Sequence, residues 1–137
     1  MPMRSCAYPD HLPPLLQAAG LRPTRQRMAL AAVLFDGCHK HMTAEQVYAA
    51  ARKKAPLSLA TVYNALHQFT AAGFLREVLV DSNQVYFDTN ISSHHHFFDE
   101  NAGELYDIPA KAVRLARLPK PPKGRRLDRV DVIIRLR

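Results

Sequence analysis

Residues 58–73 read SLATVYNALHQFTAAG, and their pattern predicts the helix on which the fold depends. Ser58 is a residue type that caps the start of a helix, and Gly73 suits the left-handed position after a helix end. Between them, apolar residues recur at helical spacing and should form one buried stripe: Leu59, Val62, Leu66 and Phe69. The opposite face carries polar side chains, namely Thr61, Asn64 and Gln68, with Tyr63 and His67 beside it. We therefore expect a helix over 59–71 that buries one side and presents polar groups on the other.

Three more helices are predicted before this one. They should span residues 12–19, 25–36 and 44–54. Gly20 follows the first, and Thr24 is a suitable N-cap for the second. The third has the clearest start, because Thr43 and Gln46 have the spacing of a capping box.

The period of the apolar pattern changes after the fourth helix. Residues 74–80 and 84–88 are rich in strand-forming side chains, and Asp81-Ser82-Asn83 between them is typical of a turn. Helices followed by a hairpin are the order of a winged helix-turn-helix domain, in which the last helix enters the major groove of DNA. A plain helical bundle with a separate hairpin is the alternative.

The rest of the chain has a different pattern. Strands are expected at 92–98 and 103–108, a helix at 110–118, a proline-rich loop at 119–124 and a closing strand at 129–136. So short a segment has too small a core to be stable alone, so pairing with a second copy is plausible. We expect an α+β protein with a winged helix DNA-binding domain over 1–89 and a small α/β dimerisation domain over 90–137.

Composition limits the partners and the compartment. The formal net charge of +7 and the pI of about 9.8 favour a polyanionic partner, although charge alone does not select DNA. The absence of a long apolar run or a signal-peptide pattern predicts a cytoplasmic protein with no membrane partner. The two cysteines, Cys6 and Cys38, are too few for a four-thiolate zinc site and are expected to be free thiols.

Three consecutive histidines are the most unusual feature. In a strand, His94 and His96 share one face and His95 points away. Neutral imidazole nitrogens bind metal ions and haem iron, so His94 and His96 form half of such a site. His41 and Asp88 are candidates for further ligands, since both could lie near the junction of the two domains. The alternative is a polar surface strand or loop.

A second cluster is basic. Arg22 and Arg25 flank the expected N-cap Thr24, and Arg27 follows in the first turn. Arginines at the start of a helix suit phosphate or minor-groove contacts, although a solvated helix face is the alternative. The sequence contains no nucleophile-elbow, P-loop or dinucleotide-binding motif, so we do not expect an enzyme.

Several of these motifs, in this order, resemble the ferric uptake regulator superfamily. The matching stretches are 20–27 (GLRPTRQR), 41–45 (HMTAE), 59–66 (LATVYNAL) and the histidine run. The stretches 86–90 (YFDTN), 94–98 (HHHFF) and 132–137 (VIIRLR) are similar to its iron response regulator subgroup. The resemblance implies a winged helix-turn-helix joined to an α/β dimerisation domain. It also implies a homodimeric repressor that binds palindrome-like operators in double-stranded DNA.

The resemblance also implies roles for single residues. Thr61, Tyr63 and Asn64 would lie in the major groove, and Arg22 would reach the minor groove. The sensory site would be formed by His41, Asp88, His94 and His96, with iron, manganese or zinc as its divalent metal.

In the subgroup, haem bound at the histidine run, His94 to His96, would lower DNA binding. A partner enzyme could supply that haem. This reading makes the protein a regulator of iron- and haem-responsive genes. A haem or metal buffer without DNA action is the main alternative, and a metal-dependent hydrolase is the third.

Two departures from the wider family concern metal sites. Where many relatives have a Cys-x-x-Cys zinc site, residues 99–102 read Asp-Glu-Asn-Ala, so the structural zinc is not expected. Of a second site in the dimerisation domain, His95 matches one position but the acidic position falls near Arg114. That second site is also not expected.

Overall fold

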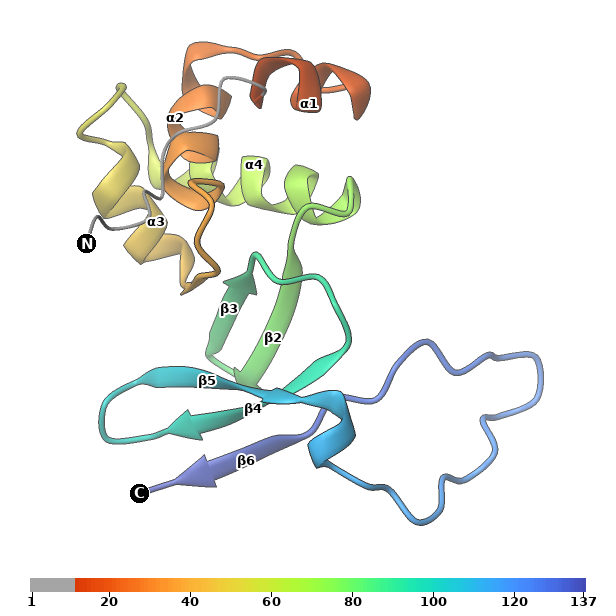
Figure 1. The fold of residues 1–137 in the computed structure, drawn as a ribbon. Helices are drawn as coiled ribbons and strands as arrows, with labels where there is room; N and C mark the ends of the chain where they lie inside the picture. Colours follow the sequence, from red (N-terminus) through yellow and green to blue (C-terminus); the bar gives the residue numbers. More distant parts are fainter. Residues whose placement is uncertain (1–11) are drawn as a thin grey trace. The chain divides into compact units, whose positions relative to one another are not determined.

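The computed structural model describes residues 12–137 of the chain (Figure 1). These residues form two compact units, with the division between Ile91 and Ser92. No helix within 12–137 is long and apolar enough to cross a membrane. The mixed content of helices and strands agrees with the predicted α+β class.

The first unit contains all four predicted helices and the hairpin. Its elements are α1 (Leu12–Ala18), α2 (Arg25–Leu34), β1 (His41–Met42), α3 (Ala44–Ala51), α4 (Leu59–Ala71), β2 (Arg76–Asp81) and β3 (Gln84–Asp88). The predicted caps are present: Thr24 and Ser58 each accept a backbone N–H from the first turn of their helix. Thr43 and Gln46 form the full capping box at the start of α3.

The core of the first unit is built on the buried stripe of α4. Val62, Leu66 and Phe69 are fully buried, and Ala65 completes the stripe. They pack with side chains from every other helix and from β3: Leu16, Leu30, Leu34, Val47 and Phe87. Leu59 was predicted to belong to the stripe, but it is 37% exposed because the first residue of the helix lies at the margin of the buried face.

The hairpin is extended by a short strand that the sequence pattern did not predict. β2 and β3 pair antiparallel, and β1 pairs with the other edge of β3, so the strand order is β1-β3-β2. Lys40 and Thr89 fix the end of this pairing, since the Lys40 amide donates to Thr89 Oγ1 at 2.9 Å. The register places His41 directly opposite Asp88.

The second unit is a three-stranded sheet. Figure 1 shows β4 (His94–Asp99) between β5 (Glu104–Pro109) and β6 (Ile133–Leu136). β4 pairs antiparallel with β5 and parallel with β6.

Two sequence expectations are wrong in the second unit. The helix expected at 110–118 is reduced to the three-residue η1 (Ala110–Ala112), and the closing strand begins at Ile133 rather than at 129. Leu115 and Leu118 are 44% and 46% exposed. Because these leucines are not buried, so short a helix would gain little from packing and is marginal in water, and the chain continues as a loop.

The register of this sheet separates its two faces. Residues that pair across strands share a face, so His94 and His96 lie on the face of Asp107. His95 lies on the other face, as predicted. That face also carries the apolar side chains Phe97, Tyr106, Ile134 and Leu136.

The cysteine expectation is wrong for Cys38. This residue follows α2 in a loop and is disulfide-bonded. The number of cysteines in a sequence does not show which of them form a disulfide bond, so the count alone could not predict this. Cys6, the other cysteine of the sequence, lies outside the described residues.

Candidate metal-binding and DNA-contacting sites

The first unit holds one pair of candidate metal ligands, which we call the first ligand set. His41 Nε2 lies 3.4 Å from Asp88 Oδ2. The Asp88 side chain is fully buried, and that of His41 is 16% exposed. A buried carboxylate needs charged or hydrogen-bonding partners, because transfer of an ion out of water is costly. The backbone N–H of Asn90 supplies one such partner to Asp88 Oδ1 at 2.8 Å, which orients Oδ2 toward the imidazole.

The second unit holds the second ligand set, formed by His94, His96 and Asp107. The Nε2 atoms of the two histidines lie 3.3 Å and 3.4 Å from the same oxygen, Asp107 Oδ1. The two imidazole rings are 4.5 Å apart between centroids. This convergence follows from the register, because His96 pairs with Asp107 across the β4–β5 ladder. One carboxylate oxygen and two imidazole nitrogens therefore point to a common centre.

The tautomer of His94 fits a cation at this centre. His94 Nδ1 lies 2.6 Å from the carbonyl oxygen of Ser92, and a carbonyl only accepts, so Nδ1 carries the proton. In the neutral ring Nε2 is then an unprotonated acceptor, and it faces the acceptor Asp107 Oδ1. Either a proton on the imidazole or a cation between the two atoms satisfies this arrangement. Imidazole nitrogen and carboxylate oxygen are ligands that manganese, iron and zinc share.

His95 has a different environment from its neighbours. Its Nδ1 accepts the backbone N–H of Val132 at 3.1 Å. This bond ties β4 to the residue just before β6, which pairs in parallel beside it. His95 thus has a structural contact in the sheet, while the haem role that the resemblance implied for it stays a prediction.

The exposed side of α4 in the first unit is flanked by two clefts. One cleft, which we call the basic flank, has a volume of about 390 Å³. It is lined mainly by α2, its preceding loop and α4: Arg22, Thr24, Gln26, Arg27, Thr61, Asn64, Ala65 and Gln68. Two guanidinium groups beside hydroxyl and amide groups suit a phosphodiester backbone and the edges of bases.

Arg27 braces the basic flank. Its guanidinium donates to the carbonyl oxygen of Arg22 and to Gln68 Oε1, both at 3.0 Å. These bonds hold the loop before α2 against α4. Arg22 and Arg25 are exposed, so their charged groups are accessible to a partner.

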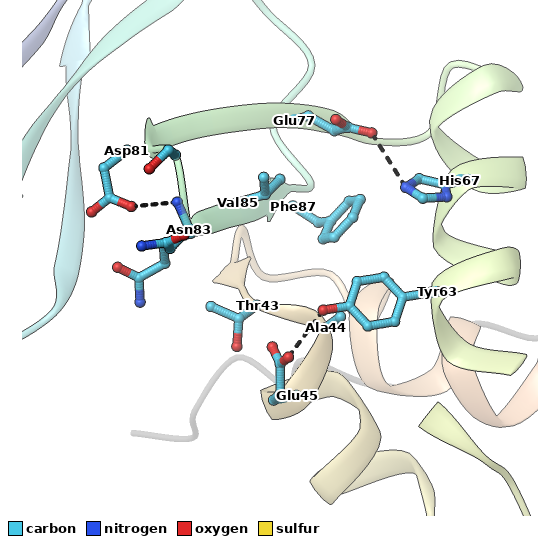
Figure 2. A pocket seen from close by; sticks show the side chains of 12 residues that line it. Thr43, Ala44, Glu45, Tyr63, His67, Glu77, Asp81, Asn83, Val85 and Phe87 are labelled. Carbon is cyan, nitrogen blue, oxygen red and sulfur yellow. Dashed lines mark hydrogen bonds and ion pairs between the residues drawn. The ribbon is translucent and has the colours of Figure 1, made fainter. Parts of the chain in front are cut away.

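The other cleft, which we call the acidic flank, lies between α4, the start of α3 and the hairpin (Figure 2). It contains Glu45, Glu77 and Asp81, and none of its lining residues is Lys or Arg. The Tyr63 hydroxyl donates to Glu45 Oε2 at 2.9 Å, and His67 Nε2 lies 3.9 Å from Glu77 Oε2. The hydrogen bond to Glu45 raises the pKa of Tyr63, with smaller contributions from burial and from the Glu45 charge.

The sequence of the chain matches a known protein family. The model of the ferric uptake regulator family matches residues 18–120. The chain belongs to the ferric uptake regulator family. Membership confirms the superfamily resemblance and the fold that it implied, a DNA-binding unit followed by an α/β unit.

Individual members show how far the likeness extends. The chain is 37% identical over 94 residues to the peroxide-responsive repressor PerR of Staphylococcus epidermidis, which covers 68% of this chain. The match spans only 62% of that repressor's length. Among solved structures, a Pseudomonas aeruginosa ferric uptake regulator with manganese has a TM-score of 0.65 and 27% identity over 90% of this chain and 95% of its own. A Vibrio cholerae ferric uptake regulator shows the same fold at a TM-score of 0.67 and 21% identity, over 89% and 95% of the two chains.

The structure brings together some of the predicted site residues of this family member and adds others. Within the first unit it pairs His41 with Asp88, and it places Arg22, Thr61 and Asn64 around one cleft. It places Tyr63 on the other flank of α4 and Arg25 at the start of α2.

Asp107 and Glu45 were missed by the sequence analysis. Asp107 lies in a strand that was predicted, but only the register of that strand shows that it meets His96. The sequence places Glu45 in the first turn of α3, but nothing in the sequence pattern predicts its hydrogen bond with Tyr63, which lies on another helix.

Proposed function

We propose that this protein is a metal-responsive, DNA-binding transcription regulator that acts as a homodimer. The observation that carries the proposal is the placement of the two ligand sets. Asp88 ends the last strand of the first unit, and His94 begins the first strand of the second. Solved relatives are described as bound to manganese, iron or zinc, which supports a divalent ion here.

We propose that one divalent ion takes ligands from both sets: His41, Asp88, His94, His96 and, in addition, Asp107. Asp88 and His94 are six positions apart in the chain, so the connection limits their separation to on the order of 20 Å. When bound, the ion supplies the positive charge that lets carboxylate and imidazole lone pairs converge. Together the two sets offer three imidazole nitrogens and two carboxylates, which are ligand types that divalent transition-metal ions bind.

Shared ligation would connect metal binding to DNA binding. The proposed division gives residues 1–89 the DNA-binding role and residues 90–137 the dimerisation role. Ligands contributed by both parts fix the part that reads DNA relative to the part that dimerises. Two reading helices then keep one spacing, which a palindromic operator requires. Without the ion the parts sample other arrangements, and the fraction of dimers able to bind falls.

The DNA contacts are assigned to the basic flank and its surroundings. Arg22 and Arg25 would contact phosphates or the minor groove, while Thr61 and Asn64 on α4 would reach base edges. Arg27 is partly buried and braces the loop, so its role is to position Arg22. Tyr63 also lies on α4, but its side chain lines the acidic flank.

The dimer interface is assigned to the apolar face of the second unit. On that face Tyr106, Ile134 and Leu136 are 46%, 39% and 37% exposed. Phe97 lies between Tyr106 and Ile134 in register, so these side chains are contiguous. A contiguous exposed apolar surface is typical of a protein–protein interface. A second copy would bury this face.

Haem is the second candidate effector, favoured by the three consecutive imidazoles of His94, His95 and His96. It would make the target genes haem- and iron-responsive, as in the iron response regulator subgroup, with a haem-supplying enzyme as a further partner. The burial of the run argues against haem, since the three residues are only 5%, 9% and 4% exposed. A porphyrin needs an open approach to its imidazole ligand. The described residues add nothing that favours a partner enzyme.

A DNA-binding titration tests this function. Chelator-treated protein is mixed with a fluorescent fragment selected from the organism's own promoters, and Mn²⁺, Fe²⁺, Zn²⁺ or haem is added separately. We expect at least one divalent ion to tighten binding to that fragment and to leave a scrambled duplex unaffected. Binding that is independent of every metal would contradict the metal-responsive role, and loss of binding on adding haem alone would favour the second candidate.

A further inference from the structure

The two flanks of α4 carry opposite charge. The basic flank contains Arg22 and Arg27, and none of its lining residues is Asp or Glu. The acidic flank contains three carboxylates and one imidazole. Phosphates are repelled by carboxylates, so a duplex that meets α4 must place its backbone on the basic side. A group on DNA that a carboxylate of the acidic flank contacts must therefore be a hydrogen-bond donor.

Among the three carboxylates, Glu45 is the one that accepts a hydrogen bond from a side chain of the reading helix. Its Oε2 accepts the hydroxyl of Tyr63 at 2.9 Å, and Figure 2 shows the two side chains pointing toward each other. Glu77 is engaged with His67, and Asp81 accepts the backbone N–H of Asn83 in the hairpin turn. Glu45 lies in the first turn of α3 and is exposed.

The hydrogen bond changes which group of the pair can read a base. The single hydroxyl proton of Tyr63 is used in the bond to Glu45, so the hydroxyl has no proton left for a base. An ionised carboxylate accepts up to about four hydrogen bonds, so Glu45 keeps most of its acceptor capacity. The raised pKa of Tyr63 has this hydrogen bond to Glu45 as its main cause.

Donors in the major groove are the exocyclic amino groups of cytosine N4 and adenine N6, whereas guanine and thymine present acceptor oxygens there. We propose that Glu45 is a specificity-determining residue that accepts a hydrogen bond from one exocyclic amino group in each half-site. Tyr63 is its positioning residue. This inference rests on the proposed DNA-binding function and adds a base contact outside the basic flank.

A selection experiment tests the inference. Metal-loaded wild-type protein and the variants Glu45→Ala, Glu45→Gln and Tyr63→Phe each select duplexes from a randomised library, and the enriched sequences are compared. Glu77→Gln is the matched control, because it removes a carboxylate from the same cleft without touching the Glu45–Tyr63 pair. Glu45 contributes no side chain to the capping box of α3, and circular dichroism checks that each variant is folded.

The expected results differ for each variant. Wild type and Glu77→Gln should both prefer an amino-bearing base at one position of each half-site, by about tenfold. Glu45→Ala should lose that preference alone. Tyr63→Phe should weaken it, and Glu45→Gln should shift it toward adenine, to which glutamine can bind in a bidentate manner.

Two failures can be told apart. If wild type enriches no sequence, the proposed DNA-binding function fails. If wild type enriches a site and folded Glu45→Ala enriches the same site with the same preferences, only the role of Glu45 is overturned.

Discussion

At the scale of single residues, three adjacent histidines lie in two distinct environments. His94 and His96 converge on Asp107, whereas His95 faces the opposite side of the sheet and accepts the Val132 amide. The alternation of a strand predicts this division of faces. It does not predict the hydrogen bond of His95, because Val132 lies 37 positions away in the chain.

His95→Ala should therefore destabilise the protein without weakening metal binding. Loss of the acceptor leaves a backbone N–H without its partner, which costs about 1–3 kcal/mol. Urea unfolding of the chelated protein measures the loss, and a metal titration of the folded variant measures affinity. A variant of unchanged stability with lowered metal affinity would contradict the structural role and restore His95 as a ligand.

The Glu45–Tyr63 pair gives a pH-dependent contribution at the same scale. The pKa of Tyr63 is raised above its ordinary value of 10.0 in the folded protein. The pair's contribution to stability is thus complete below pH 10 and is lost as the pH rises through the higher folded pKa.

Glu45→Gln should lower the pKa of Tyr63 toward its ordinary value. The measurement is tyrosinate absorbance as a function of pH, with the signal of Tyr63 isolated by subtracting the curve of Tyr63→Phe. An unchanged midpoint in Glu45→Gln would show that the carboxylate does not hold the hydroxyl in solution.

At the scale of elements, the sequence predicted correctly those features that depend on residues close together in the chain. The caps at Thr24, Thr43 and Ser58 are all formed, because each is closed by residues within one turn. The helix expected at 110–118 failed because a helix this short needs a surface for its apolar side chains, and that surface is not encoded locally. The strand β1 and the candidate ligand Asp107 likewise depend on register with other strands.

Thr43→Ala tests the strength of a local signal. Removing the hydroxyl that accepts the backbone N–H of Gln46 should lower the free energy of unfolding by about 1 kcal/mol. Ser82→Ala, in the exposed hairpin turn, is the control and should change stability by less than about 0.5 kcal/mol. Chemical denaturation of both variants makes the comparison. Equal stabilities would show that the capping box contributes little to this fold.

At the scale of the whole molecule, the second unit combines two surfaces on one sheet. One face carries the second ligand set, and the other carries Phe97, Tyr106, Ile134 and Leu136. A metal site and a dimer interface on opposite faces of three strands would let metal binding act on the assembled dimer. Among the described residues of this unit the buried apolar side chains are Phe98, Leu105 and Ile108, and so small a core supports the proposed pairing with a second copy.

Ile134→Asp should weaken the dimer. A carboxylate in the middle of an apolar interface is desolvated without a partner, so the dimer dissociation constant should rise by about tenfold or more. Leu79→Asp, at an exposed position of β2 in the first unit, is the control. Sedimentation equilibrium reports the constant for each. An Ile134→Asp protein that dimerises as tightly as the control would place the interface elsewhere.

The central claim is that one ion takes ligands from both units and thereby controls DNA binding. It is tested by the metal-dependent gain in operator affinity, measured by fluorescence anisotropy for wild type, His41→Ala, His96→Ala and the exposed neighbour His39→Ala. We expect wild type and His39→Ala, a change at an exposed residue, to show the full gain. Each of the other variants, changed in one unit alone, should lose most of it. A full metal-dependent gain in folded His41→Ala and in folded His96→Ala would contradict the account.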